Sequence, residues 1–302
     1  MKIGLIGAGA VGAYFIWGFG NLEEDEREFV VIAEGDRKER LANNGIKING
    51  KVYHPNVQAP EDAGICDVII MATKSYSVAE AAKALPAIVG EDTVVLSMLN
   101  GVDSEEIIAG VIGWEHVMHS VILIPSRRLP DEVIFDESFP IVVYYGAITV
   151  SDPDKKLKMV ADAFCGTKMH FEESADILYD EWYKYARNIC NNLPQAVVTA
   201  PAGIYTRSEH GRFLAQKLWD EVRVLAKLKG VILAEEADMY ACADSTRYST
   251  LQDIDSRRHT EVDCLCGYLM KLADENGIEV PYLSYTYHAI KLIEEKNDGK
   301  FE

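Results

Sequence analysis

The chain has 302 residues, of which 48% are hydrophobic and 26% are charged, and its formal net charge at pH 7 is −18. This length favours two domains, and the apolar content is that of a chain with ordinary cores rather than a disordered one. A strongly negative surface repels polyanions, which argues against nucleic acid and anionic membranes as partners. No apolar run reaches the roughly 18–20 residues of a membrane-spanning helix, and the N-terminus does not read as a signal peptide.

Six cysteines are scattered along the chain without a CxxC pair. Such a pattern is typical of reduced thiols in a cytoplasm rather than of a disulfide framework, so we expect a cytoplasmic protein. Cys264 and Cys266 are separated by a single residue, which does not match the usual zinc spacings. We therefore interpret them as packing residues and expect no metal site.

The first half of the chain alternates short apolar runs with segments of helical length. Continuous apolar runs of this kind indicate parallel strands covered on both faces. Alternation of strand and helix predicts an α/β fold with a doubly wound parallel sheet. The predicted strands are residues 2–6, 29–33, 67–72, 93–99 and 117–124.

A glycine-rich sequence connects the first strand to a helix that we expect to extend to about residue 18. Gly7 permits the sharp turn, Gly9 lets the backbone approach a pyrophosphate, and Gly12 allows the helix to pack closely on the strand. The helix N-terminus offers N–H groups to phosphate. In this context the motif predicts a Rossmann domain that binds a dinucleotide, although a tight turn in a domain without ligand is the alternative. The predicted cofactor-binding residues of this turn are Gly7, Ala8, Gly9, Ala10, Val11 and Gly12.

Polar residues follow three of these strands. Glu34 stands about where an acid hydrogen-bonds the ribose of NAD, but Arg37 and Lys38 follow directly and are suited to the 2′-phosphate of NADP, so both cofactors remain open. Lys74 and Asn100 come after the third and fourth strands, at the edge where such sheets bind ligands. We predict Lys74 as a phosphate or carboxylate partner and Asn100 as a donor near nicotinamide or substrate; each alone could be an ordinary loop residue.

The second half of the chain is mostly helical. Strand patterns recur at 141–145 and 168–171 and then fade, and apolar periodicity predicts helices through Leu214–Leu225, Val262–Leu272 and residues 284–296, with Gly277 as a stop. The predicted domains are residues 1–170, which bind the dinucleotide, and residues 171–302, which form an all-helical substrate domain.

One predicted helix carries Lys184, Asn188 and Asn192 at intervals of four, which places them on one face because each such step advances only about 40° around the axis. A carbonyl that accepts hydride becomes an alkoxide and needs a proton donor or a fixed cation. Lys184 is the candidate, since desolvation would ease its proton transfer. The two asparagines supply neutral donors for a substrate carboxylate or hydroxyl. A polar face in water is the alternative, and we expect Pro194 to end or kink the helix.

Together these motifs resemble the ketopantoate reductase (2-dehydropantoate 2-reductase) family over nearly the whole chain. The resemblance rests on GAGAVG, on K-x-x-x-N-x-x-x-N-x-P from Lys184 to Pro194, and on Ser249 followed by L-Q-D-I and by R-x-T-E-x-D from Arg258 to Asp263. It implies hydride transfer from NADPH or NADH to the 2-keto group of ketopantoate, giving pantoate in pantothenate biosynthesis. The implied partner is a small 2-oxo acid. The last predicted helix, residues 284–296, could pair with a second copy in a homodimer, although its amphipathic pattern fits ordinary packing equally well.

The resemblance also implies roles for individual residues. Lys184 would be the general acid, and Asn188, Asn192 and Ser249 would bind substrate. Asn100 would serve both cofactor and substrate, Lys74 would lie beside the cofactor, and Glu261 would close the cleft near the cofactor and help to place the lysine. A helix N-cap for Ser249 and a surface position for Glu261 are the alternatives.

The chain departs from the family in two places. Glu34 stands where many members carry an arginine for the 2′-phosphate of NADP, and Gln195 directly follows Pro194, where it could alter the substrate pocket. Reduction of another branched 2-oxo acid is therefore one alternative function. A non-catalytic NAD(P)-binding sensor, which would use the same Rossmann domain for binding alone, is another.

Overall fold

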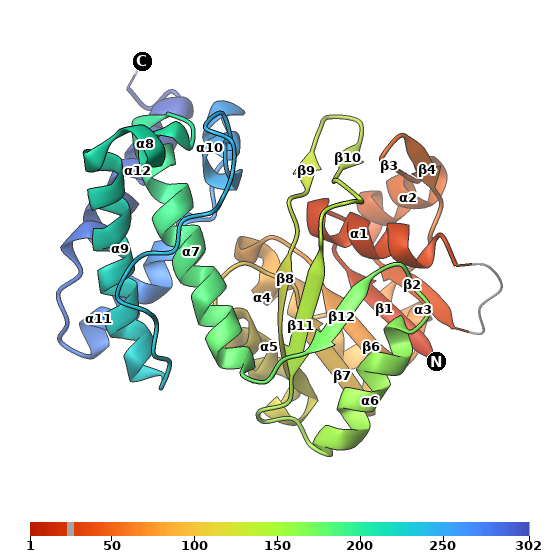
Figure 1. The fold of residues 1–302 in the computed structure, drawn as a ribbon. Helices are drawn as coiled ribbons and strands as arrows, with labels where there is room; N and C mark the ends of the chain where they lie inside the picture. Colours follow the sequence, from red (N-terminus) through yellow and green to blue (C-terminus); the bar gives the residue numbers. More distant parts are fainter. Residues whose placement is uncertain (23–26, 302) are drawn as a thin grey trace. The chain divides into compact units, whose positions relative to one another are not determined.

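A computed structural model describes residues 1–22 and 27–301, which form two compact units (Figure 1). The first unit contains Met1–Leu99 and Asp103–Ile177, and the second begins at Leu178 and also includes the short segment Asn100–Val102. The chain thus passes from one unit to the other after Ile177. The boundary predicted from the sequence, between residues 170 and 171, falls within the strand His170–Glu173.

The first unit is built on a sheet in the strand order β12-β11-β8-β7-β6-β1-β2-β5. Its neighbouring strands are parallel except β11 and β8, which are antiparallel. The predicted α/β doubly wound fold is therefore confirmed, with one antiparallel pair that the sequence did not indicate. The strands are β1 (Lys2–Ile6), β2 (Glu28–Ile32), β5 (Asn56–Gln58), β6 (Cys66–Met71), β7 (Val89–Ser97), β8 (Val117–Leu123), β11 (Val142–Gly146) and β12 (His170–Glu173).

Each face of this sheet packs against its own helices. Successive side chains of a strand point to opposite faces, and accordingly Ile70 of β6 belongs to one core and Ile69 to the other. The first core includes residues of α1 (Ala10–Phe19) and α6 (Pro153–Phe164). The second includes residues of α3 (Pro60–Ala63), α4 (Val78–Ala82) and α5 (Ser104–Ile112). The remaining helices are α2 (Gly35–Asn44), η1 (Ser75–Ser77), η2 (Leu85–Ala87) and η3 (Trp114–His116).

A second, small sheet belongs to the same unit and was not predicted. Its strand order is β4-β3-β10-β9. The hairpin between β3 and β4 turns at Asn49 and Gly50, both of which have positive φ, 45° and 84°. Asn-Gly is the preferred pair for such a turn. The strands are β3 (Ile46–Ile48), β4 (Lys51–Tyr53), β9 (Arg127–Arg128) and β10 (Val133–Ile134).

The described part of the second unit is helical, as predicted. Pro194 does not end its longest helix, which continues past the proline. The helix predicted over Val262–Leu272 is instead a π-helical turn followed by an α-helix, and Gly277 ends it with φ +65°. The elements are α7 (Ile177–Val198), α8 (Gly203–Arg207), α9 (Glu209–Leu228), α10 (Ser249–Asp255), η4 (Asp263–Gly267), α11 (Tyr268–Glu275) and α12 (Pro281–Asn297).

One continuous apolar core joins α7, α9, α11 and α12. Trp219 of α9 is its largest fully buried side chain, and its indole N–H donates to the carbonyl of Ala234 at 2.8 Å. Within the described residues, no helix is both long enough and apolar enough to cross a membrane.

We expect Gly12→Ala to lower the free energy of unfolding by about 2–4 kcal/mol, because a Cβ there would lie 1.8 Å from the carbonyl oxygen of Gly7. Gly110, in α5, is the matched control, since a Cβ at that position meets no atom within 4 Å. Gly110→Ala should stabilise the helix by up to about 1 kcal/mol. Urea unfolding of both variants measures this difference, and equal midpoints would contradict it.

Candidate active site

The glycine-rich turn between β1 and α1 has the shape that a pyrophosphate needs. Gly7 has φ +105°, and a Cβ there would lie 2.6 Å from the carbonyl oxygen of Ala72. A Cβ on Gly9 would meet only one atom, at 3.9 Å, so the backbone there faces open space. Gly9 is also the N-cap of α1 and offers no side-chain acceptor to the first N–H groups of the helix. These N–H groups are therefore suited to an anionic ligand. The intervening Ala8, Ala10 and Val11 pack against the first core.

Thr73 gives a second sign of a polar ligand beside this turn, and the sequence analysis did not identify it. Its backbone nitrogen would lie 2.8 Å from a Cβ on Gly7. Its hydroxyl oxygen is buried and has no hydrogen-bond partner among the described residues. Since buried polar atoms are almost always paired, this hydroxyl is suited to a group of a bound dinucleotide.

Glu34 and Lys74 lie at the same edge of the sheet as the glycine turn, because β6, β1 and β2 are adjacent parallel strands. Glu34 is exposed at the beginning of α2, and Lys74 is exposed at the beginning of η1. Lys38, one of the two basic residues that follow Glu34, forms an ion pair with Asp62 at 3.4 Å.

Lys184, Asn100 and Glu261 are joined by hydrogen bonds within the second unit. The ammonium of Lys184 donates to Asn100 Oδ1 at 3.1 Å, and Asn100 Nδ2 donates to Glu261 Oε2 at 3.2 Å. The backbone of Asn100 is held as well, since Cys264 Sγ donates to its carbonyl oxygen at 2.8 Å. The structure thus brings together three of the residues that the sequence analysis singled out.

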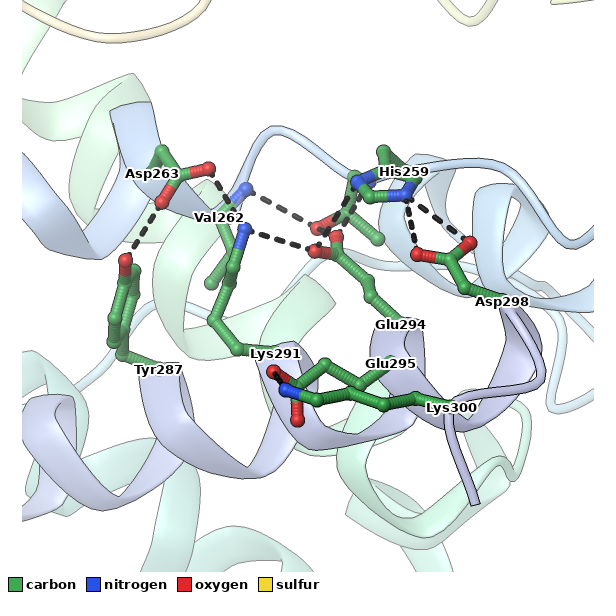
Figure 2. A network of polar contacts seen from close by, with 10 residues as sticks. His259, Val262, Asp263, Tyr287, Lys291, Glu294, Glu295, Asp298 and Lys300 are labelled. Atoms are coloured by element: carbon green, nitrogen blue, oxygen red, sulfur yellow. Dashed lines mark hydrogen bonds and ion pairs between the residues drawn. The ribbon is translucent and has the colours of Figure 1, made fainter. Parts of the chain in front are cut away.

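The segment that carries Glu261 is anchored on α12 (Figure 2). The backbone N–H and the hydroxyl of Thr260 both donate to the buried carboxylate of Glu294, at 2.7 Å each. Lys291, also on α12, lies 3.1 Å from Asp263 and so holds the other end of the segment, and it forms an ion pair within the helix with Glu294 at 3.0 Å. Burial alone would lower the pKa of Lys291, but the hydrogen bonds to Glu294 and Asp263 outweigh it and raise that pKa to about 12. Lys291 therefore stays charged at neutral pH.

The π-helical turn after Glu261 is also held by α7. The hydroxyl of Tyr185 lies 2.8 Å and 2.9 Å from the carbonyl oxygens of Cys264 and Leu265. A π-helical turn displaces carbonyls from the α-helical hydrogen-bond pattern and is often found at functional sites. Tyr185 directly follows Lys184, so the same stretch of α7 that carries the lysine also fixes the turn beside Glu261.

Asn188 and Asn192 lie one and two helical turns beyond Lys184. The hydroxyl of Tyr240 donates to Asn188 Oδ1 at 3.2 Å, which leaves the Nδ2 group of Asn188 as the donor end of that amide. Burial raises the pKa of Tyr240 to about 12, so its hydroxyl remains a donor at neutral pH. Asn192 is buried, and its Oδ1 has no hydrogen-bond partner among the described residues. Ser249 is the exposed first residue of α10, and its N-cap is Tyr248, so Ser249 itself is not the cap.

A second polar row on α7, Arg187, Asn191 and Gln195, also repeats every four residues, and the sequence analysis missed it as a row. Asn191 accepts from the backbone N–H of Tyr240 at 3.0 Å, and Gln195 accepts from that of Tyr248 at 3.1 Å. Gln195 is buried, and its hydrogen bond holds the backbone of the residue that precedes Ser249. The guanidinium of Arg187 lies over the ring of Tyr240, 4.0 Å from its centre.

Two family models match this chain: "Ketopantoate reductase PanE/ApbA" over residues 3–148 and "Ketopantoate reductase PanE/ApbA C terminal" over residues 176–294. The chain belongs to the ketopantoate reductase family. It is thus an oxidoreductase of this family, which bears out the resemblance drawn from its motifs. The assignment also confirms a nicotinamide dinucleotide, NAD or NADP, as the cofactor.

Individual relatives are distant but match over the full length. The chain is 26% identical to an uncharacterized oxidoreductase, YkpB, of Bacillus subtilis, with 97% of this chain and 99% of the relative covered. It is 24% identical to a 2-dehydropantoate 2-reductase of Nostoc sp., with 98% and 96% covered. Among solved structures, D-mandelate dehydrogenase with NADH and anilino(oxo)acetate has a TM-score of 0.85 at 19% identity, with 99% of each chain covered.

Within residues 1–22 and 27–301, no group of three or more His, Cys, Asp or Glu side chains is arranged to hold a metal ion. Cys264 and Cys266 are both buried, and burial raises the pKa of the Cys266 thiol.

Glu294→Ala should lower the free energy of unfolding by about 2–4 kcal/mol, because it removes the carboxylate that accepts both hydrogen bonds from Thr260 and leaves a buried N–H unpaired. Glu295→Ala is the control, since the side chain of Glu295 is 42% exposed and forms an ion pair with Lys300 at the surface, and it should change stability by less than about 0.5 kcal/mol. Thermal unfolding of the two variants tests this, and comparable losses in both would contradict it.

Proposed function

We propose that this protein reduces ketopantoate to pantoate with NADPH or NADH, as a 2-dehydropantoate 2-reductase of pantothenate biosynthesis. The family assignment supports the reaction class. The finer proposal of substrate rests on one observation: the buried Oδ1 of Asn192 has no partner among the described residues, on the helix face that carries Lys184. A carbonyl oxygen of this kind needs a donor, and the 4-hydroxyl group of ketopantoate is one.

In this proposal Lys184 is the proton donor. The cofactor, when bound by the glycine turn, supplies a hydride to the 2-keto carbon. The carbonyl oxygen gains negative charge as this happens, and an N–H proton of the Lys184 ammonium passes to it, leaving a neutral amine and the alcohol product. The hydrogen bond to Asn100 Oδ1 fixes the direction of the ammonium, and Glu261 fixes the amide of Asn100 through its other end.

Asn188, Asn192 and Ser249 are the proposed substrate-binding residues. Because Tyr240 donates to Asn188 Oδ1, the Nδ2 group of Asn188 is the end that serves a substrate carboxylate. Asn192 Oδ1 would accept the 4-hydroxyl, and the Ser249 hydroxyl would contact the same part of the substrate. Glycine-turn residues, Glu34, Lys74, Asn100 and Glu261 are the proposed contacts of the cofactor.

The second candidate is reduction of an aryl 2-oxo acid, and the likeness to D-mandelate dehydrogenase favours it. Benzoylformate, the oxo acid that corresponds to mandelate, has no 4-hydroxyl and would leave Asn192 Oδ1 unpaired. A non-catalytic sensor would bind NADH or NADPH and turn over neither acid. We also propose a homodimer in the cytoplasm; a ketopantoate reductase from Staphylococcus aureus is described as dimeric.

A panel of substrates tests the proposed reaction with each cofactor. Ketopantoate should give the highest kcat/KM, and 3,3-dimethyl-2-oxobutanoate, which lacks only the 4-hydroxyl, should be at least about 100-fold poorer because a buried acceptor is left unpaired. Asn192→Leu should shrink this difference to within about tenfold. Preferred turnover of benzoylformate would instead support the aryl candidate, and cofactor binding without any turnover would support the sensor.

Lys184→Ala should lower kcat by about 10²–10⁴-fold while the Kd of NADH and NADPH changes little, since the lysine acts on the reacting oxygen and not on cofactor binding. Lys271→Ala is the matched control, because Lys271 lies on α11 with a side chain that is 76% exposed, and its kcat should equal that of the wild type. Near-normal turnover by Lys184→Ala would rule out the lysine as general acid.

A further inference from the structure

Arg128 reaches the glycine turn from the small sheet. It lies on β9, in the hairpin whose other strand, β10, pairs with β3. Its Nη1 group donates to the carbonyl oxygen of Ala8 at 3.3 Å. A guanidinium is therefore held at the centre of the Gly-Ala-Gly turn, although Arg128 is 120 positions away from Ala8 in the sequence.

A second positive charge acts on Arg128. Arg40, on α2, is the charged group that acts on it: loss of hydration and the charge of Arg40 both lower the pKa of Arg128. In the described part of the chain, neither arginine forms an ion pair with an acidic side chain. Arg128 contacts the glycine turn directly, and an anion bound there would relieve the repulsion between the two like charges.

The donor geometry selects the kind of anion. A guanidinium has five N–H donors in a planar fork that matches the oxygens of a phosphate. One of these donors forms the hydrogen bond to the carbonyl oxygen of Ala8. The next residue of the turn, Gly9, faces open space at the N-terminus of α1. We propose that Arg128 binds the pyrophosphate of the dinucleotide cofactor, opposite the backbone N–H groups of the glycine turn. This inference depends on cofactor binding and not on which oxo acid is reduced.

NADH and NADPH both contain the pyrophosphate, whereas only NADPH carries the 2′-phosphate. A pyrophosphate contact of Arg128 therefore predicts an equal effect on both cofactors, and a 2′-phosphate contact would not. Arg128→Gln should raise the Kd of both cofactors by the same factor, about 10- to 100-fold, because a charge-assisted hydrogen bond is lost. Arg128→Lys should recover part of the affinity, since it keeps the charge without the fork. Both dissociation constants are measured by titrating the fluorescence of the reduced nicotinamide.

Arg127→Gln is the matched control. Arg127 precedes Arg128 on the same strand, and successive strand side chains point to opposite faces, so its removal changes the net charge equally without touching the turn. It should change either Kd less than about twofold. The melting temperatures of the three variants without cofactor should equal that of the wild type, which separates lost binding from lost folding.

Three results would overturn the inference: unchanged affinities in Arg128→Gln, a loss confined to NADPH, or an equal loss in Arg127→Gln. A wild-type protein that binds both cofactors but reduces no oxo acid would refute the proposed reaction and leave the assignment of Arg128 intact.

Discussion

The terminal amide of Asn100 connects an ammonium to a carboxylate. Its oxygen accepts from Lys184 at 3.1 Å and its nitrogen donates to Glu261 at 3.2 Å. One short side chain therefore sets the direction of a cation that lies on α7 and of an acid that precedes a π-helical turn. Because an amide has one acceptor end and one donor end, it can join opposite charges without adding a third. The local arrangement of the second unit around Asn100 follows from this requirement.

Much of that arrangement consists of buried polar groups that hold other polar groups in place. Glu294 takes both donors of Thr260, next to Glu261. Asn191 and Gln195 take backbone N–H groups from the irregular segment between α9 and α10. A buried polar network costs free energy when one of its groups lacks a partner, and it fixes side-chain positions when every group is paired. Such networks therefore determine one geometry. Asn192 differs from them: its Oδ1 is buried and unpaired among the described residues, and it is suited to substrate for that reason.

The proposed ligand site of the first unit is built mainly from backbone groups rather than from a network of side chains. Its glycine turn offers backbone N–H groups and open space, and the positive charge that such a turn lacks comes from a separate hairpin, through Arg128. Backbone N–H groups and a helix N-terminus carry only partial charges, whereas a pyrophosphate carries full ones. A guanidinium beside the turn supplies the difference, in a protein whose net charge of −18 would otherwise disfavour an anionic ligand.

Short-range sequence patterns were enough to predict the parallel sheet, the glycine turn and the row of Lys184, Asn188 and Asn192, because the strand and helix repeats and the glycine motif each involve only neighbouring residues. A similar row of polar side chains, Arg187 to Gln195, and the Asn49-Gly50 hairpin were equally visible in the sequence and were missed. Only the tertiary structure decided that Asn100 lies between Lys184 and Glu261, that Glu294 holds Thr260, and that Arg128 meets Ala8. These pairs are 84, 161, 34 and 120 positions apart, and single residues at such separations leave no periodic pattern, since their contacts depend on how whole elements pack.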